Sequence, residues 1–256
     1  MNPNAYLTGL FNESESPLLF IDFDGTISKR DVIDEILNRF ATKDWLEIEK
    51  LWLAGKIGSR ECLRRQFELV KATPDTLDDF IASMEVDEGF PQLLRFCRDA
   101  RISVHIVSDG FDYYIRRMLN GSLGQLMAEC GVTIWANRLL PVDGGSWTTD
   151  FPFQRTICQH GCATCKPLVM RSVNESAAPT VFIGDGLSDR FAAKAADVVF
   201  AKATLSEFCF RNRLKQTTFS GLAQVADALD SAFEFFITNL YRDRGWPTVA
   251  KASSRR

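Results

Sequence analysis

The chain of 256 residues has only two histidines, no excess of basic residues and no long apolar run. Thirty Lys and Arg against 33 Asp and Glu give a net charge of −3. This charge argues against bulk nucleic-acid binding, which needs a basic face. No run of about 18 apolar residues offers a transmembrane helix, since Asp227, Asp230 and Glu234 interrupt the most apolar late segment, 221–241. The first ten residues lack the basic region of a signal peptide, so we expect a cytoplasmic protein.

The composition is that of a folded globular protein. Hydrophobic residues make up 46% of the chain and charged residues 25%, which excludes disordered and fibrous classes. The length fits one large domain or a core domain that carries a smaller insertion. The seven cysteines are an odd count in a chain too large to depend on disulfides, so we expect reduced thiols.

Short apolar runs predict buried strands at residues 17–22, 102–107, 180–183 and 198–200. Helical patterns separate or follow these runs at residues 90–101, 111–119, 167–174, 187–196 and 222–241. Strands that alternate with helices indicate a parallel sheet with helices on both faces. We therefore expect an α/β fold built on a Rossmann-like parallel sheet.

Two segments depart from this alternation. Residues 31–86 show only helical spacing, including a Thr73-Pro74 helix start, and predict an inserted all-helical cap domain. Residues 132–153, with Asp143-Gly144-Gly145 near the middle, predict an appended antiparallel hairpin. The catalytic core would then comprise residues 1–30 and 87–241, followed by a basic, loose tail at 242–256.

Acids, hydroxyls and glycines follow three of the predicted strands, at residues 22–26, 108–110 and 184–189. Each group alone could be an ordinary turn, because Asp and Gly are common there. Ligands of open α/β sheets, however, bind outside the carboxyl ends of the strands. Three such groups at one sheet edge therefore indicate a functional site.

The spacing of the acids indicates a cation site. Asp22 and Asp24 lie two residues apart, so in an extended segment their side chains share a face. Together with Asp185 they form a set of hard oxygen ligands that suits Mg²⁺. A carboxylate at such a site can attack phosphorus while the metal neutralises the phosphate oxygens.

Other residues of the same edge could hold the phosphate oxygens. Ser108 and the backbone N–H groups near Gly25 and Asp109 are suitable donors. The site still lacks a positive charge. Lys166, in Cys165-Lys166-Pro167 at the start of the expected helix, is the best-placed candidate for it.

These strings carry a family resemblance. LLFIDFDGTIS, IVSDG, CKP and FIGDGLSD, which span Leu18 to Asp189, resemble in order the four motifs of the haloacid dehalogenase (HAD) superfamily of phosphohydrolases. A cap between the first and second motifs is similar to that of the phosphoserine-phosphatase-like branch. Within it, residues 108–119, 160–167 and 184–202 most resemble the methionine-salvage phosphatase group. That group acts on 2-hydroxy-3-keto-5-methylthiopentenyl-1-phosphate or related phosphomonoesters.

The resemblance implies a role for each acid. Asp22 matches the nucleophile that becomes an aspartyl-phosphate, and Asp24 matches the general acid and base. Asp22, the Asp24 backbone carbonyl and Asp185 would bind Mg²⁺. Asp189 would hold a metal-bound water or Lys166.

It also implies the phosphate and substrate contacts. Ser108 and Lys166 would bind the phosphoryl group, with Gly25, Asp109 and Gly110 beside them. Asp109 replaces a glycine of the phosphoserine phosphatases, which counts against serine phosphate as the substrate. Asp31 either contacts the substrate or is an ordinary acid of a first helical turn.

We expect the partner to be a small phosphorylated metabolite, with neither nucleic acid nor membrane, and the protein to be a monomer or homodimer. The alternatives are a phosphoserine or phosphocholine/phosphoethanolamine phosphatase, a phosphotransferase, and a catalytically silent phosphate-binding protein. A silent protein need not keep both Asp22 and Asp24. The arginines of the cap, Arg60, Arg64 and Arg65, either meet substrate anions or form a solvated face.

One further cluster comprises Cys158, His160, Cys162 and Cys165. These residues could bind Zn²⁺, but structural zinc sites usually have a second, separate pair of ligands. We therefore expect thiols that shape the loop before Lys166.

Overall fold

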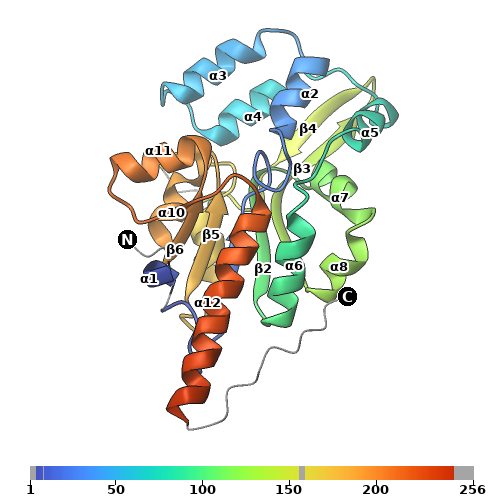
Figure 1. The fold of residues 1–256 in the computed structure, drawn as a ribbon. Coiled ribbons are helices and arrows are strands. Elements are labelled where there is room, and N and C mark those ends of the chain that lie inside the picture. The colour runs from blue at the N-terminus through green and yellow to red at the C-terminus, as the bar shows by residue number, and fades with distance from the viewer. Residues whose placement is uncertain (1–3, 8, 156–158, 245–256) are drawn as a thin grey trace.

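A computed structural model describes residues 4–7, 9–155 and 159–244. Within this part of the chain the strands form one seven-stranded sheet of order β4-β3-β2-β1-β5-β6-β7 (Figure 1). The strands are β1 (Leu18–Ile21), β2 (Ser103–Phe111), β3 (Thr133–Val142), β4 (Ser146–Asp150), β5 (Thr180–Gly184), β6 (Val198–Ala201) and β7 (Thr217–Thr218). Only the β3–β4 pair is antiparallel in the described sheet. The predicted parallel sheet and hairpin are therefore confirmed.

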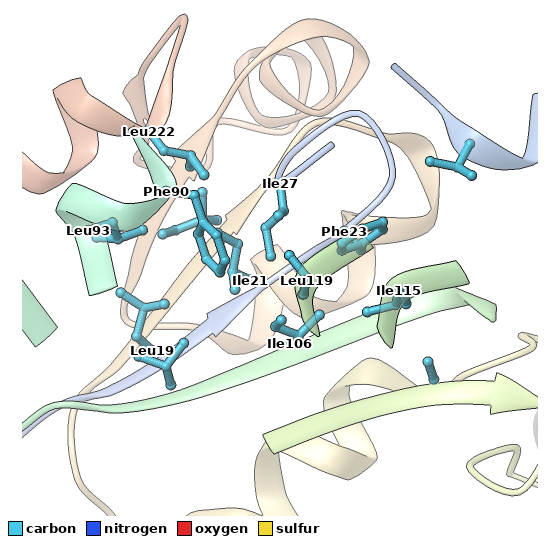
Figure 2. Close-up of a cluster of buried hydrophobic side chains, with 14 of the residues drawn as sticks. Leu19, Ile21, Phe23, Ile27, Phe90, Leu93, Ile106, Ile115, Leu119 and Leu222 are labelled. Atoms are coloured by element: carbon cyan, nitrogen blue, oxygen red, sulfur yellow. The ribbon is translucent and has the colours of Figure 1, made fainter. Parts of the chain in front are cut away.

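Alternate residues of the central strand point to opposite faces of the sheet. Leu19 and Ile21 belong to the larger apolar cluster (Figure 2), whereas Phe20 belongs to a second cluster on the other face. The larger cluster is covered by α1 (Asn4–Leu7), α6 (Phe90–Asp99), α7 (Asp112–Asn120), α8 (Gly124–Glu129) and α12 (Leu222–Asp243). The second is covered by α9 (Lys166–Val173), α10 (Arg190–Ala195) and α11 (Ala203–Arg211). Burial on both faces explains why the strands are almost wholly apolar.

The segment between β1 and α6 folds as helices. They are α2 (Val32–Phe40), α3 (Trp45–Leu53), α4 (Ser59–Phe67) and α5 (Pro74–Ala82). Thr73 caps α5 by accepting the N–H of Thr76, and proline follows it as expected. In Figure 1, α2, α3 and α4 lie above the carboxyl ends of the strands. The all-helical insertion is confirmed, and its extent as a separate domain stays a prediction.

The insertion is packed directly on the core. Phe67 of α4 and Phe111 at the end of β2 meet edge to face, with ring centroids 4.5 Å apart. Both rings are fully buried and belong to one apolar cluster that continues from the sheet into the cap. The cap is thereby held over the ends of β1 and β2.

Some elements differ from the sequence expectation. The helix expected at 187–196 starts as a 3₁₀ turn, η1 (Leu187–Asp189), before α10. Helices α1, α8 and α11 and the two-residue strand β7 were not expected from the sequence, and each spans nine residues or fewer. None of the described helices is both long and apolar enough to span a bilayer. The predicted tail lies outside the described residues from 245 onwards.

Candidate active site

Strand pairing brings the first two acids of the site together. The Asp22 N–H donates to the carbonyl of Ile183 at 2.9 Å, which continues the β1–β5 pairing to the end of both strands. Gly25 then turns the chain with a φ of +72°, and a Cβ there would lie 2.5 Å from Oδ2 of Asp185. Only glycine combines this backbone conformation with so close an approach. The turn therefore sets Asp22 and Asp185 side by side.

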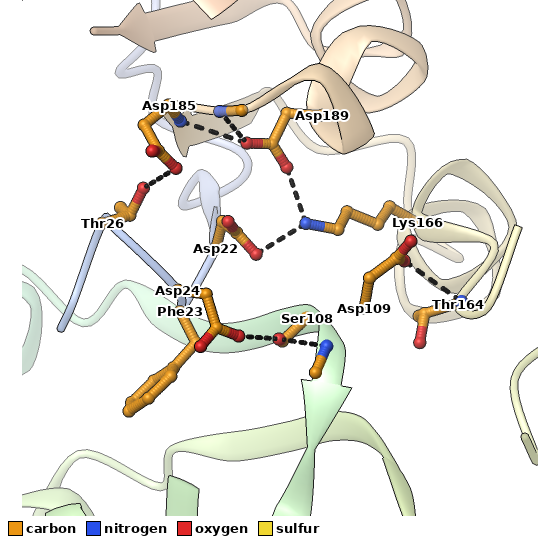
Figure 3. Close-up of polar contacts among 12 residues, drawn as sticks. Asp22, Phe23, Asp24, Thr26, Ser108, Asp109, Thr164, Lys166, Asp185 and Asp189 are labelled. Carbon is orange, nitrogen blue, oxygen red and sulfur yellow. Dashed lines mark hydrogen bonds and ion pairs between the residues drawn. The ribbon is translucent and has the colours of Figure 1, made fainter. Parts of the chain in front are cut away.

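Lys166, the first residue of α9, lies between two of the acids (Figure 3). Its Nζ is 2.6 Å from Oδ1 of Asp22 and 2.6 Å from Oδ1 of Asp189, and all three side chains are buried. Burial alone lowers the pKa of Lys166, but the charges of Asp189 and Asp22 outweigh it, so the pKa is raised. The lysine is therefore held as a cation.

The other oxygen of Asp189 fixes the end of β5. Its Oδ2 accepts the backbone N–H groups of Asp185 and Gly186, each at 3.1 Å. Thr26 donates its hydroxyl to Oδ1 of Asp185 at 3.0 Å. These bonds orient two acids from one loop toward Asp22.

Three of the acids could hold a metal ion. Asp22, Asp185 and Asp189 each offer a carboxylate oxygen within 4.8 Å of the others. Burial, followed by the charge of Asp189, raises the pKa of Asp22 well above its usual range and that of Asp185 to about 6. Three carboxylates face one ammonium, and a divalent cation would offset the remaining charge. Hard oxygen ligands of this kind fit Mg²⁺.

The Asp24 carboxylate stands apart from this group. It accepts hydrogen bonds from the Tyr114 hydroxyl (2.6 Å), the Ser108 hydroxyl (3.2 Å) and the Val32 N–H (3.2 Å). Burial raises the pKa of Asp24 to about 6, although these three donors act in the opposite direction. A carboxyl group with such a pKa can give and take a proton near neutral pH.

Ser108 and Asp109 are engaged within the protein. The Ser108 hydroxyl accepts the N–H of Gly110 at 2.8 Å while it donates to Asp24. The Asp109 carboxylate accepts the Ser59 hydroxyl at 2.7 Å and the Thr164 N–H at 3.1 Å. The Asp109 side chain is thus bonded to the cap and to the loop before Lys166.

A cavity of about 130 Å³ lies between core and cap, and from the core it is lined by Asp22, Asp24, Ser108, Asp109, Gly110 and residues 185–188. The cap contributes acids, an aromatic ring, apolar groups and polar groups: Asp31, Ile33, Asp34, Glu49, Trp52, Ser59, Cys62, Leu63 and Gln66. No lysine, arginine or histidine is among the described residues that line it. Arg60, Arg64 and Arg65 therefore lie outside its wall, and Arg64 pairs with Glu61 and Glu68 at the surface.

The structure adds residues that sequence reasoning missed. Tyr114 and Thr26 bond to Asp24 and Asp185, and Ser59 reaches the site from the cap. Thr26 lies inside the string LLFIDFDGTIS, which was a signal for it. Tyr114 and Ser59 are isolated hydroxyls on helices, and their roles depend on how those helices pack.

The structure describes both histidines and three of the four residues of the predicted cysteine cluster. His105 is buried and stacks on Phe20, with ring centroids 5.2 Å apart, as a core histidine would. Cys158 lies outside the described residues. Within the described ranges, His160, Cys162 and Cys165 are not among the groups close enough to hold a metal ion.

Known proteins are similar to this chain in sequence and in fold. A family model described as haloacid dehalogenase-like hydrolase matches residues 19–194. The chain is 29% identical over 221 residues to the 2-hydroxy-3-keto-5-methylthiopentenyl-1-phosphate phosphatase of Bacillus thuringiensis (strain Al Hakam), covering 84% of this chain and 97% of that one. It is 30% identical over 214 residues to the phosphatase of the same name from Geobacillus thermodenitrificans (strain NG80-2), covering 83% and 94% of the two chains.

Two solved structures show the same fold. A substrate-bound phosphoserine phosphatase complex has a TM-score of 0.57 at 23% identity, over 77% of this chain and 91% of that chain. An unliganded probable phosphoserine phosphatase from Vibrio cholerae has a TM-score of 0.63 at 18% identity, over 89% and 66%. With the motifs, the helical cap and the acid-rich cavity, these matches identify the chain as a member of the haloacid dehalogenase-like hydrolase family and one of its phosphatases.

Proposed function

We propose that this protein hydrolyses small phosphomonoesters through an aspartyl-phosphate at Asp22, with Mg²⁺ as cofactor. The observation that carries the proposal is the contact of buried Lys166 with both Asp22 and Asp189, behind the cap-covered cavity that Asp22 and Asp185 line. A buried carboxylate next to a fixed cation is an oriented nucleophile. The lysine and the metal ion would both face the charge of an incoming phosphoryl group.

The reaction needs two displacements at phosphorus. In the first, an Asp22 oxygen forms a bond to phosphorus, the bond to the leaving oxygen breaks, and Asp24 gives that oxygen its proton. In the second, Asp24 takes a proton from water, the water oxygen bonds to phosphorus, and the bond to Asp22 breaks. Inorganic phosphate and free Asp22 result.

The remaining residues keep this geometry. Asp22, Asp185 and Asp189 would hold Mg²⁺, with the Asp24 backbone carbonyl as the expected fourth protein ligand. When bound, the ion supplies positive charge that neutralises the phosphate oxygens. Tyr114 and Ser108 hold the Asp24 carboxylate by hydrogen bonds, and Lys166 holds Asp22.

The first candidate substrate is that of the curated relatives, 2-hydroxy-3-keto-5-methylthiopentenyl-1-phosphate. Its leaving group carries no charge and ends in a methylthio group. Ile33, Trp52 and Leu63 give the cap side of the cavity an apolar surface on which such a group could pack. We accordingly propose a cytoplasmic metabolite of this kind as the substrate.

The acids of the cap favour phosphorylated amino alcohols as a second candidate. Asp31, Asp34 and Glu49 line the cavity beside Trp52, and no described basic residue lines it with them. A cationic ammonium group would be attracted to this wall and to the face of the tryptophan ring. The carboxylate of phosphoserine would instead meet like charges.

A substrate series tests the proposal. EDTA-treated protein, assayed with and without Mg²⁺, would be offered the methylthiopentenyl ester, phosphoethanolamine, phosphocholine, phosphoserine and p-nitrophenyl phosphate. We expect Mg²⁺-dependent phosphate release from the methylthiopentenyl ester, from the two phosphorylated amino alcohols, or from both classes. Phosphoserine should release little. Glu49→Gln should raise KM only for the cationic esters, and Glu47→Gln on the exposed face of α3 is the matched control. Full activity after chelation would contradict the metal requirement.

A further inference from the structure

Asp109 lies where three chain segments meet: the end of β2, the start of the cap helix α4, and the segment 159–165 that leads into α9. Its Oδ2 accepts the Ser59 hydroxyl at 2.7 Å, and its Oδ1 accepts the Thr164 N–H at 3.1 Å. The first donor belongs to the cap, and the second lies two residues before Lys166. One carboxylate therefore bonds to the cap and to the segment that carries the lysine.

The cap is also bonded directly to that segment. The Ser59 hydroxyl accepts the Ala163 N–H at 2.9 Å, and the Arg60 N–H donates to the Gly161 carbonyl at 3.1 Å. Gly58 packs on the same peptide, and a Cβ at Gly58 would lie 2.6 Å from the Gly161 carbonyl carbon. The start of α4 thus contacts the segment through hydrogen bonds and close packing.

A buried asparagine supports the other side of this junction. Asn137 on β3 donates its amide to the Asp109 carbonyl at 2.6 Å and accepts the Thr164 hydroxyl at 3.3 Å. Its side chain is fully buried, so these bonds do not compete with bulk water. Asp109 and Thr164 are therefore held together by their own bond and by Asn137.

We infer that Asp109 is a positioning residue that couples the seating of the cap over the cavity to the placement of Lys166. Displacement of the α4 start would break the bonds of Ser59 to Asp109 and to Ala163 together. The segment before α9 would then keep the bonds of Thr164 to Asp109 and Asn137 and of the Cys165 N–H to the Phe153 carbonyl but lose its bonds to the cap, so the ammonium of Lys166 would be held less firmly beside Asp22. Turnover would therefore depend on a cap hydroxyl that bonds to Asp109 and Ala163 rather than to Asp22 or Lys166.

The test compares Ser59→Ala, Asp109→Asn and the double variant with the wild type. Because the activity readout rests on the proposed function, p-nitrophenyl phosphate hydrolysis with Mg²⁺ is paired with an activity-free readout, amide hydrogen exchange at 159–166. Ser83→Ala is the matched control, because among the described residues the Ser83 hydroxyl bonds within the cap, to the Phe80 carbonyl. Ser59→Thr keeps a hydroxyl and should rescue.

We expect Ser59→Ala to lower kcat/KM by roughly tenfold, mainly through kcat. It should also speed exchange at the Thr164 amide, to which Ser59 is not bonded. The double variant should be no worse than the poorer single variant within about twofold, since both changes break one connection. Ser83→Ala and Ser59→Thr should resemble the wild type.

Two results would overturn the inference: unchanged exchange at Thr164 in Ser59→Ala, or losses that multiply in the double variant. A wild-type protein inactive on every phosphomonoester would refute the proposed function instead. The exchange measurement would then still decide whether the cap and the Lys166 segment are coupled.

Discussion

The ammonium of Lys166 lies 2.6 Å from Oδ1 of Asp22, and both side chains are shielded from solvent. An ion pair without access to water keeps one geometry, because neither partner can be solvated separately. The nucleophile proposed here is therefore oriented before any substrate arrives. The same contact makes the fold depend on the lysine.

Replacing the lysine should affect both stability and turnover. Lys166→Met leaves Asp22 and Asp189 buried without their counter-ion, so the free energy of unfolding should fall by about 3–5 kcal/mol. Loss of the fixed charge should lower kcat by roughly 10²–10³-fold. Urea unfolding and steady-state kinetics measure the two effects. Lys194→Met, at an exposed lysine of α10, is the control. If Lys166→Met were as stable as this control, the buried ion pair of Lys166 with Asp22 would have no role in stability.

The acid role of Asp24 predicts a dependence on the leaving group. Asp24→Asn should lower turnover of alkyl phosphates by roughly 10²–10⁴-fold. The loss should be smaller for p-nitrophenyl phosphate, whose leaving group needs little protonation. Rates across a series of phenyl and alkyl phosphates measure this. Equal losses for all leaving groups would remove Asp24 from the acid role.

The acid cluster predicts a specific metal defect. Asp185→Asn preserves the shape of the side chain and an acceptor for the Thr26 hydroxyl but removes one charge from the cluster. The Mg²⁺ concentration for half-maximal activity should therefore rise, while kcat at saturating Mg²⁺ falls less. Mg²⁺ titrations of EDTA-treated protein measure both quantities. The control Asp227→Asn, at an exposed acid of α12, should leave the Mg²⁺ titration unchanged. If Asp185→Asn had the same half-maximal Mg²⁺ concentration as the wild type, Asp185 would be excluded as a metal ligand.

Much of the site could be predicted because its residues follow strands whose ends meet at one sheet edge. Asp22, Asp24 and Asp185 stand in short, ordered strings after β1 and β5, so pairing alone brings them together. The charge of Lys166 was expected from its order along the chain. Its contacts with Asp22 and Asp189 are consistent with that expectation.

The contributions of the helices could not be read in the same way. Ser59 and Tyr114 reach the site only because α4 and α7 pack at particular angles, and no short pattern encodes such packing. The bonds of Asp109 to Ser59 and Thr164 likewise depend on three segments far apart in sequence. Helices α1 and α8 were missed because four and six residues are too few to show a helical period.

Buried His105 predicts a pH dependence of stability. Burial lowers the pKa of His105 in the folded protein, whereas an unfolded histidine has a pKa of about 6.5. Below that pH the unfolded chain binds a proton that the folded chain rejects, so stability should fall as the pH falls. His105→Phe should lose less stability than the wild type between about pH 7.5 and 5. Urea unfolding across this pH range measures the difference, and an equal loss in His105→Phe and the wild type would contradict it.

The central claim is that phosphate passes through Asp22. The most direct measurement is rapid acid quenching of the enzyme during turnover of p-nitrophenyl phosphate, followed by peptide mass spectrometry. We predict one phosphoryl group on the peptide that contains Asp22, more of it in Asp24→Asn, and none in Asp22→Asn, with at least roughly 10⁴-fold slower turnover in that last variant. Turnover by Asp22→Asn within about tenfold of the wild type would contradict the covalent mechanism.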